Sequence, residues 1–420
     1  MSNPVFGALI ETAGKEPTLH IPSVRMAGGA AGFHVSENEY ARMERGFKRL
    51  SARSLLMASP QDSLILNRAP DREYLALLRH SGAGGANHVI PSESHGQCLA
   101  EDAQNCPATL KFIRDWPGAV EFYMVSDMDE RLATQSNKPL PEHQAHVTAL
   151  LNDKVFFTRT LEDLGLPMIE TYVGPSDSVA FRLEKDPGWP VVARSSRSVG
   201  GAAVWKAETA TQRQALKKIV ERRRGEVFLL QKWVPSVSSP NLQIYVGSRS
   251  ICVLGLSIQK FHDTTHHAGN YFQGSGDKDV DLALLRQGKA IAMEAARLGY
   301  LGVLGVDFIV TANGDVFAME INARHNTSTH ALWFSNRLIN NDPFLAVPPG
   351  RVAYMRWPSA RGRLSAMEWM GILGAAAFDP KKGEGVLPFD CGYEGLEAAI
   401  LAGDMERRQW LERMAEMAVA

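Results

Sequence analysis

Acidic and amide side chains interrupt two apolar runs between residues 305 and 330. The runs are rich in β-branched residues and flank Asn313-Gly314, a pair that favours a β-hairpin with a type I′ turn. Counting residue pairs outward from that turn places Asp307 opposite Glu320. Because side chains alternate along a strand, Asn322 lies on the same face as Glu320. The residues expected on the opposite, buried face are Phe317, Met319 and Ile321.

Two carboxylates that oppose each other need a compensating positive charge, because like charges directly opposite in an antiparallel pair destabilise it. A divalent cation with oxygen ligands meets this need, since Mg²⁺ takes one or two carboxylates and completes its coordination with water and substrate phosphates. Two other interpretations compete: Arg324 could pair with Glu320, or the acids could be solvated on an edge hairpin. The apolar neighbours Met319 and Ile321 favour the metal site.

A second segment of interest is a glycine- and serine-rich turn between two expected strands, at residues 189–194 and 202–206. Backbone N–H groups in such a turn can form a concave nest for phosphate oxygens, and Arg194, Arg197 and Lys206 surround it with positive charge. A mobile surface hairpin would have the same composition, so this interpretation stays open beside the phosphate site.

The expected strand at residues 226–234 carries Gln231 and Lys232 among apolar residues. Buried polar groups need partners, and the edge of an adenine ring could supply them. The alternative is that both side chains reach solvent from the end of the strand.

The composition sets limits on function. The chain has 420 residues, of which 45% are hydrophobic and 22% charged, with a net charge of −1 and a pI near 6.9. This balance gives no electrostatic reason to expect nucleic acid or an anionic membrane as partner. The four cysteines are widely scattered, and the first residues lack a basic segment followed by an apolar one. We therefore expect a cytoplasmic protein.

Three blocks follow one another along the chain. Residues 1–150 alternate short apolar runs with helical patterns, which is typical of an α/β domain. A polar stretch at residues 135–141 marks the boundary to a second block at 151–345, which includes helical patterns at 152–164 and 282–298. The last block, 346–420, has helical runs at 367–378 and 406–417, and we expect it to be mainly helical.

The order of these parts resembles the ATP-grasp superfamily. The likeness rests on Asp153-Lys154 at a helix start, the loop after Arg194, the strand through Gln231, and then Asp307, Glu320 and Asn322. The spacing of the acids is similar to the D-alanine–D-alanine ligase pattern. The resemblance covers roughly residues 152–344, and it implies ATP held between two α+β lobes, with an α/β pre-ATP-grasp domain ahead of them.

The resemblance also implies roles for individual residues. Adenine would lie against residues 231–234, and Asp307, Glu320 and Asn322 would hold one or two Mg²⁺ ions, with Mn²⁺ as a substitute. The residues expected to bind the nucleotide are Lys154, Arg194, Ser195, Ser196, Gly200, Gly201, Gln231, Lys232, Trp233 and Val234.

One position departs from the pattern. Many relatives carry an arginine two residues before the first metal-binding acid, where this chain has Gly305. Positive charge for the transferred phosphoryl group is therefore expected from Arg324, with Arg286 and Arg197 as further catalytic residues.

The substrate residues are less well defined by the sequence. His262, His266 or His267 could orient a substrate or take a proton from an amine, although a structural histidine cluster or a zinc site would also fit these residues. By analogy with the family, the residues that line the acceptor site are Asn326, Ser328 and Trp333.

The flanking blocks look like those of the pheganomycin-type peptide ligases. This likeness implies a ligase that uses ATP to convert a carboxylate into an acyl phosphate and joins it to an amine, in natural-product biosynthesis. Its substrates would be small molecules or peptides; a second copy of the chain and a carrier protein stay open as partners. Two alternatives are a related enzyme with a thiol or bicarbonate as nucleophile, and a non-catalytic nucleotide-binding scaffold.

Overall fold

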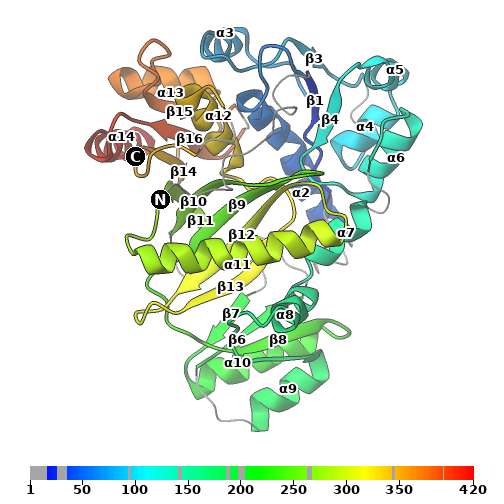
Figure 1. Ribbon diagram of the computed structural model, residues 1–420, viewed down its shortest axis with the longest axis vertical. Helices are drawn as coiled ribbons and strands as arrows, with labels where there is room; N and C mark the ends of the chain where they lie inside the picture. Colours follow the sequence, from blue (N-terminus) through cyan, green and yellow to red (C-terminus); the bar gives the residue numbers. More distant parts are fainter. Residues whose placement is uncertain are drawn as a thin grey trace.

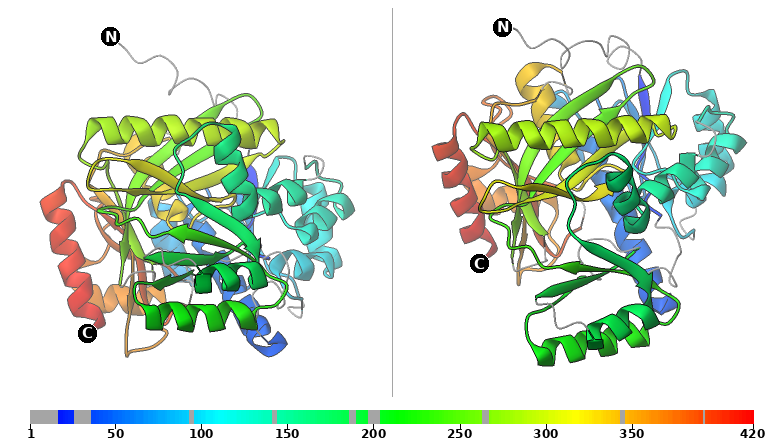
Figure 2. Two further views of the ribbon diagram at one scale, coloured as in Figure 1. Left: turned by 90° about the horizontal axis from the view of Figure 1, so that it is seen from below. Right: turned by 60° about the horizontal axis from the view of Figure 1, so that its bottom comes forward.

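The computed structural model describes residues 17–25, 36–92, 96–140, 144–185, 190–196, 204–262, 267–342, 346–390 and 392–420. These residues form three sheets with helices around them (Figure 1). A small lobe with α9 and α10 projects from one end of the molecule, and the views in Figure 2 show it facing the large central sheet.

The N-terminal unit is a parallel sheet of four strands in the order β3-β2-β1-β4. Apolar residues of the strands pack against α4, α5 and α6 in one core. This arrangement agrees with the α/β unit expected from the sequence. Its strands are β1 (Thr18–Ile21), β2 (Ser63–Ile65), β3 (Asn87–Val89) and β4 (Ala119–Phe122). Its helices are α2 (Glu37–Arg49), η1 (Leu50–Leu56), α3 (Arg72–His80), α4 (Leu99–Gln104), α5 (Pro107–Asp115) and α6 (Asp127–Gln135).

The small lobe is an antiparallel sheet in the order β5-β8-β6-β7, covered by α9 and α10. Two helices, α7 (Gln144–Leu151) and α8 (Lys154–Asp163), connect the N-terminal unit to this lobe. The elements of the lobe are β5 (Thr171–Pro175), α9 (Ser176–Lys185), β6 (Val191–Ser195), β7 (Val204–Ala207), α10 (Ala210–Arg222) and β8 (Val227–Lys232).

The central sheet has eight strands in the order β13-β12-β9-β10-β11-β14-β16-β15, and all its pairings are antiparallel. Helix α11 crosses one face of it in Figure 1, and residues of α12 pack with its other face. The elements contributed by the middle of the chain are β9 (Pro240–Val246), β10 (Ile251–Phe261), β11 (His267–Phe272), α11 (Lys278–Arg297), β12 (Gly302–Val310), β13 (Val316–Asn322) and α12 (Thr329–Asn340).

The C-terminal block differs from the expected, mainly helical segment, because it adds three strands to the central sheet. Alternate residues of β14 face opposite sides: Ala353 and Met355 pack against the terminal helices, whereas Val352 and Tyr354 join the core around α12. The elements of this block are β14 (Val352–Pro358), α13 (Ala366–Leu373), η2 (Gly374–Ala376), β15 (Gly385–Pro388), β16 (Gly395–Leu401) and α14 (Met405–Val419).

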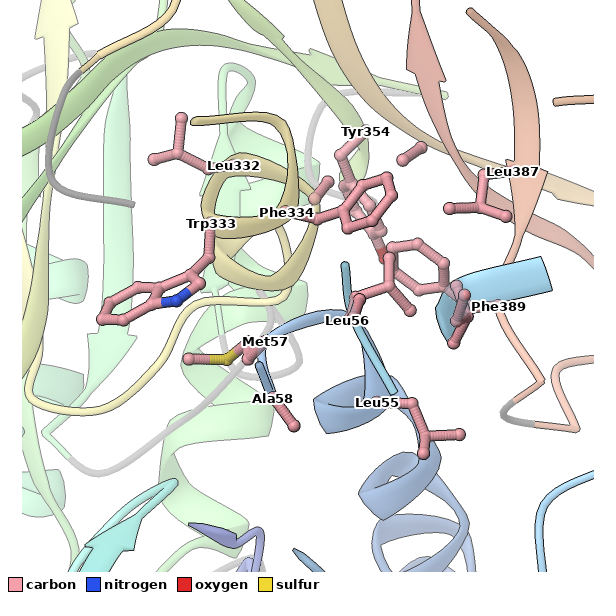
Figure 3. Close-up of a cluster of buried hydrophobic side chains, with 14 of the residues drawn as sticks. Leu55, Leu56, Met57, Ala58, Leu332, Trp333, Phe334, Tyr354, Leu387 and Phe389 are labelled. Atoms are coloured by element: carbon pink, nitrogen blue, oxygen red, sulfur yellow. The ribbon is translucent and has the colours of Figure 1, made fainter. Parts of the chain in front are cut away.

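One apolar core ties the N-terminal unit to the C-terminal strands (Figure 3). Leu55, Leu56 and Met57 of the N-terminal unit pack with Phe334 of α12 and with Phe389. A buried ion pair crosses the same contact: Arg53 Nη2 lies 2.7 Å from Glu397 Oε1, and the two side chains are 3% and 0% exposed. The first and last blocks of the chain are therefore parts of one packed body.

Within the described ranges, no helix has the length and apolar character needed to cross a lipid bilayer.

We expect Arg53→Met to lower the free energy of unfolding by about 3–5 kcal/mol, because it leaves the buried carboxylate of Glu397 without its main partner. Urea unfolding measures the effect. The control is Lys111→Ala, which removes a pair whose side chains are 75% and 55% exposed and should leave the unfolding midpoint unchanged. Equal midpoints for both variants would contradict the prediction.

Candidate functional site

A cavity of about 1130 Å³ lies between the small lobe and the central sheet. Lys154, Arg194 and Gln231 line it from α8, β6 and β8, and Asp307 and Glu320 line it from the central sheet. The cavity can hold a nucleotide together with a second molecule, because drug-sized ligands occupy sites of roughly 300–1,000 Å³.

Asp307 lies directly opposite Glu320 in the β12–β13 pairing, as predicted from the sequence. The turn that produces this register differs from the prediction. Thr311 N donates to Asp315 O, so the loop has three residues, and within it Gly314 takes a positive φ of 84° while Asn313 does not. A type I turn followed by a left-handed residue explains this loop.

A β-bulge at Met319 compensates for the extra loop residue. Phe308 pairs with Ala318 and Asp307 with Glu320, so Met319 has no partner across the ladder. The bulge also changes which residues are buried: Val316, Ala318 and Ile321 are in the core. The expectation that Phe317 and Met319 face the core was therefore wrong, and Met319 lines the cavity.

Asp307 is held by amide groups. Asn241 Nδ2 donates to its Oδ1 at 2.7 Å, Gln259 Nε2 donates to the same oxygen at 3.1 Å, and Asn322 Nδ2 donates to its Oδ2 at 2.9 Å. Burial, and then the nearby charge of Glu320, raise the pKa of Asp307 to about 6. The neutral amides orient this carboxylate but leave its negative charge largely uncompensated.

Glu320 is held by cations instead. Arg194 Nη2 lies 2.7 Å from its Oε2, and Lys154 Nζ lies 3.2 Å from the same oxygen. Burial alone would raise the pKa of Glu320, but the charges of Lys154 and Arg194 outweigh it and lower the pKa to about 2. Lys154 is only 4% exposed, and burial lowers its pKa despite the attraction of Glu320.

Asn322 connects Arg324 to the carboxylates. Arg324 Nη1 donates to Asn322 Oδ1, whose Nδ2 donates to Asp307. Across the described residues no three His, Cys, Asp or Glu side chains gather as a metal cluster. The site instead combines two carboxylates with an amide, which are the oxygen ligands that Mg²⁺ prefers. The raised pKa of Asp307 fits a cation there, because a positive charge would offset the repulsion from Glu320.

Gln231 has one satisfied and one unsatisfied polar atom. Its Nε2 donates to Thr171 Oγ1 at 2.8 Å, whereas its Oε1 is buried and has no hydrogen-bond partner within the described chain. Lys232, Trp233 and Val234 also line the cavity, and Lys206 Nζ lies 3.9 Å from the centre of the Trp233 ring. The Oε1 atom of this cavity-lining residue is thus a buried acceptor without a donor among the described residues.

The predicted phosphate loop is described only at its start. Ser195 is buried and donates to Glu226 Oε2 at 2.9 Å, and Ser196 O accepts from Lys154 N at 3.1 Å. Neither serine lines the cavity. Three further predicted residues lie outside the described residues: Arg197, Gly200 and Gly201.

Gly305, where the family resemblance led us to expect an arginine, has a steric explanation. A Cβ atom at this position would lie 2.3 Å from Asn326 Nδ2 and 2.7 Å from Asn326 Cγ. Asn326 lines the cavity, and its Nδ2 is a buried donor without a partner among the described residues. The missing side chain at Gly305 is therefore what allows Asn326 to approach β12.

Some of the remaining predicted residues line the cavity, and others lie on the surface or in the core. His262, His267 and Ser328 line the cavity. Arg286 is on the exposed side of α11, and Trp333 is 8% exposed in the core of Figure 3, so neither is among the described residues that line the cavity. Their predicted roles gain no support from the cavity.

A row of polar side chains crosses one face of the central sheet and forms the floor of the cavity. Strand register produces the row, since Asp307 pairs with Asn241, Gln259 with Asn270, and Asn270 with Tyr354. The sequence analysis missed most of it. Polar residues at alternate positions of an apolar strand, such as Asn241 and Gln243 in β9, were the available signal. The lining residues missed in this way include Asn241, Gln259, Asn270, Arg356 and Tyr393.

Residues 153–332 match the family described as RimK-like ATP-grasp domain. N-acetylaspartylglutamate synthase A of Mus musculus is 27% identical over 175 residues, which cover 41% of this chain and 44% of that protein. The carbamoyl phosphate synthase large chain of Myxococcus xanthus is 22% identical over 174 residues, which cover 41% of this chain and 16% of that protein. The chain therefore matches less than half the length of each of these proteins.

Solved structures are similar over nearly the whole chain. A biotin carboxylase from Campylobacter jejuni has a TM-score of 0.61 at 13% identity, covering 97% of this chain and 92% of that chain. An N5-carboxyaminoimidazole ribonucleotide synthetase from Thermus thermophilus has a TM-score of 0.57 at 16% identity, with coverages of 96% and 98%. An L-amino acid ligase from Bacillus licheniformis has a TM-score of 0.54 at 11% identity, with coverages of 96% and 97%. Identities this low concern the fold alone, and the expected ATP-grasp fold is confirmed.

We expect Gly305→Ala to lower the free energy of unfolding by about 1–3 kcal/mol, because the added methyl group would collide with Asn326. Thermal unfolding measures the change. The matched control is Gly46→Ala in helix α2, where an added Cβ meets nothing within 4 Å and alanine favours the helix. If Gly305→Ala is as stable as Gly46→Ala, the close approach of Asn326 to β12 does not exist.

Proposed function

We propose that this chain, which has the ATP-grasp fold, is an ATP-dependent ligase that joins a carboxylate to an amine through an acyl phosphate. The observation that carries the proposal is the pairing of Asp307 with Glu320 at the floor of a cavity between two lobes. The relatives support it, because their names include an L-amino acid ligase and an N-acetylaspartylglutamate synthase.

The small lobe is proposed to hold the nucleotide. Gln231 Oε1, which lacks a donor among the described residues, would accept a hydrogen bond from the amino group of adenine, beside the segment 232–234. Lys154 and Arg194 would exchange part of their contact with Glu320 for phosphate oxygens. Both cations lie at the cavity wall, so binding of a polyanion needs no new charge to be brought in.

Asp307, Glu320 and Asn322 are proposed to hold Mg²⁺, and Mn²⁺ could replace it. When bound, the cation would neutralise charge on the β- and γ-phosphates. Arg324 contributes a further positive charge, and its contact with Asn322 fixes it beside the same carboxylates. These residues hold the phosphoryl acceptor and the nucleotide in line, which removes most of the entropic cost of the reaction.

The second step forms the amide bond. The amine attacks the acyl carbon, the C–O bond to phosphate breaks, and one proton leaves the nitrogen. His267 is the proposed acceptor of this proton, because it lines the cavity and burial lowers its pKa. Its Nε2 lies 2.8 Å from Asn270 Oδ1, and Asn270 Nδ2 donates to Ser257. With Nε2–H donating to Asn270 Oδ1, Nδ1 is the ring nitrogen that would take the proton.

A peptide ligase of natural-product biosynthesis is the proposed subclass, from the resemblance to the pheganomycin-type enzymes. Product masses test it, since a thiol or bicarbonate as nucleophile would give a thioester or a carboxylated product. A scaffold without catalysis would give no product.

We expect ADP release to require a carboxylate and an amine together, to stop when EDTA removes divalent cations, and to return with Mg²⁺ or Mn²⁺. Glu320→Ala should reduce this release by at least about 100-fold, because Lys154 and Arg194 lose the group that holds them. A coupled ADP assay with an amino-acid and peptide panel measures the rates, and circular dichroism checks that the variant is folded. Full turnover by Glu320→Ala would refute the site assignment.

We expect Asp307→Asn to abolish turnover but to make the cation-free protein more stable by roughly 1–3 kcal/mol at pH 8, because it removes a buried charge opposite Glu320. Urea unfolding with and without Mg²⁺ measures the difference. A further expectation is that Mg²⁺ stabilises the native protein and leaves the variant unchanged. A less stable variant would mean that Asp307 is needed for packing rather than for binding.

A further inference from the structure

The C-terminal strand β14 brings an arginine to the cavity. Arg356 lines it together with Tyr393, and the guanidinium carbon lies 4.5 Å from the centre of the Tyr393 ring. Within the part of the chain that the structure describes, the side chain of Arg356 makes no hydrogen bond or ion pair, and its Nε is buried without a partner. A half-buried guanidinium with unused donors is costly unless a ligand satisfies it.

The carboxylate of Glu397 makes no ion pair with Arg356. Glu397 lies opposite it in the β14–β16 pairing, but both carboxylate oxygens are already engaged. Arg53 Nη2 lies 2.8 Å from Oε2 and 2.7 Å from Oε1, and the Tyr354 hydroxyl donates to Oε1 at 2.7 Å. Two guanidinium groups thus share one carboxylate, which leaves one positive charge at this end of the cavity.

Among the described residues, the charged neighbours of Arg356 are Arg53 and Glu397, and His267 and Tyr393 are the ring-bearing ones. His267 stacks on Tyr354 with ring centroids 6.2 Å apart, and burial lowers the pKa of His267 with a further contribution from the charge of Arg356. Lys260 is not part of this end, because it pairs with Glu412 of α14 at 2.8 Å, away from the cavity lining. The surplus charge therefore belongs to Arg356.

The positions of Arg356 and Asp307 in the sheet set the length of a substrate that would reach both. Asp307 is on β12, and three strands separate β12 from β14 in the sheet. Four strand spacings amount to roughly 19 Å across the sheet, and the register adds an offset along β14, because the position across from Asp307 is Val352. An extended peptide therefore needs at least about five or six residues to cover the distance.

We infer that Arg356, with Tyr393, forms an anion-binding subsite at the end of the cavity remote from Asp307. It would bind a carboxylate or phosphate group of the substrate, at least about five residues from the reacting group. This inference rests on the proposed function, because only that function says what the substrate is. The subsite itself is defined by the charge of Arg356 and by its place in the cavity.

Binding measurements test the inference without requiring turnover. The probes are three pentapeptide amides, four alanines followed by glutamate, glutamine or phosphoserine, titrated calorimetrically with Mg²⁺ and a non-hydrolysable ATP analogue present. The native protein should bind at least one of the two anionic peptides about tenfold more tightly than the glutamine peptide, and the comparison of glutamate with phosphoserine identifies the preferred group.

Three variants complete the test. Arg356→Gln should remove the preference, Arg356→Lys should keep part of it, and Arg361→Gln, an exposed arginine outside the cavity, should leave it unchanged. If Arg356→Gln does not fold, the comparison of Arg356→Lys with the native protein decides. Equal binding of all peptides by the native protein, or a preference that survives Arg356→Gln, would overturn the inference. If the protein prefers the anionic peptides but never releases ADP, the proposed ligase activity is refuted and the anion-binding subsite is still supported.

Discussion

Backbone register places two like-charged carboxylates face to face. Their electrostatic repulsion is the constraint that the other residues of the site compensate. Asp307 and Glu320 are fixed opposite each other by the ladder between β12 and β13. The structure treats the two acids differently: amides hold Asp307, whereas Lys154 and Arg194 hold Glu320. As a result the pKa of Asp307 is raised and that of Glu320 is lowered. A divalent cation would supply the charge that the amides do not.

The sequence predicts the paired acids of this site but not the details of the hairpin that carries them. The acids, their pairing and their place after an amphipathic helix follow from alternation and turn signals. The prediction of the pairing, however, rested on two errors that cancel, a two-residue turn and an uninterrupted strand. The three-residue loop shifts the register by one, and the bulge at Met319 shifts it back. Sequence patterns of this length contain no clear signal for a bulge, so the buried face of β13 was assigned wrongly.

Tertiary context explains the other differences. The segment 395–401 is rich in alanine and leucine, which favour helices, yet it forms β16 because every residue is buried between neighbouring strands and helices. The three C-terminal strands therefore escaped prediction, and with them the place of Arg356. The N-terminal parallel sheet was easier, because its short apolar runs alternate with helical patterns. Trp333 and Arg286 show the limit of analogy with the family. Each is on a helix, and the face of the helix on which it lies decides whether its side chain reaches the cavity.

Some of the buried polar atoms without a hydrogen-bond partner belong to residues that line the cavity. Four buried atoms that lack partners within the described residues belong to residues that line the same cavity: Gln231 Oε1, Asn241 Oδ1, Asn326 Nδ2 and Arg356 Nε. They come from β8, from β9, from the segment before α12 and from β14, so no local packing defect explains them together. Each such atom costs about 1–3 kcal/mol if nothing binds it. A set of ligands that satisfied all four would extend from the small lobe, across the paired carboxylates, to the C-terminal strands, which is the extent that the proposed nucleotide and peptide-sized substrate would have.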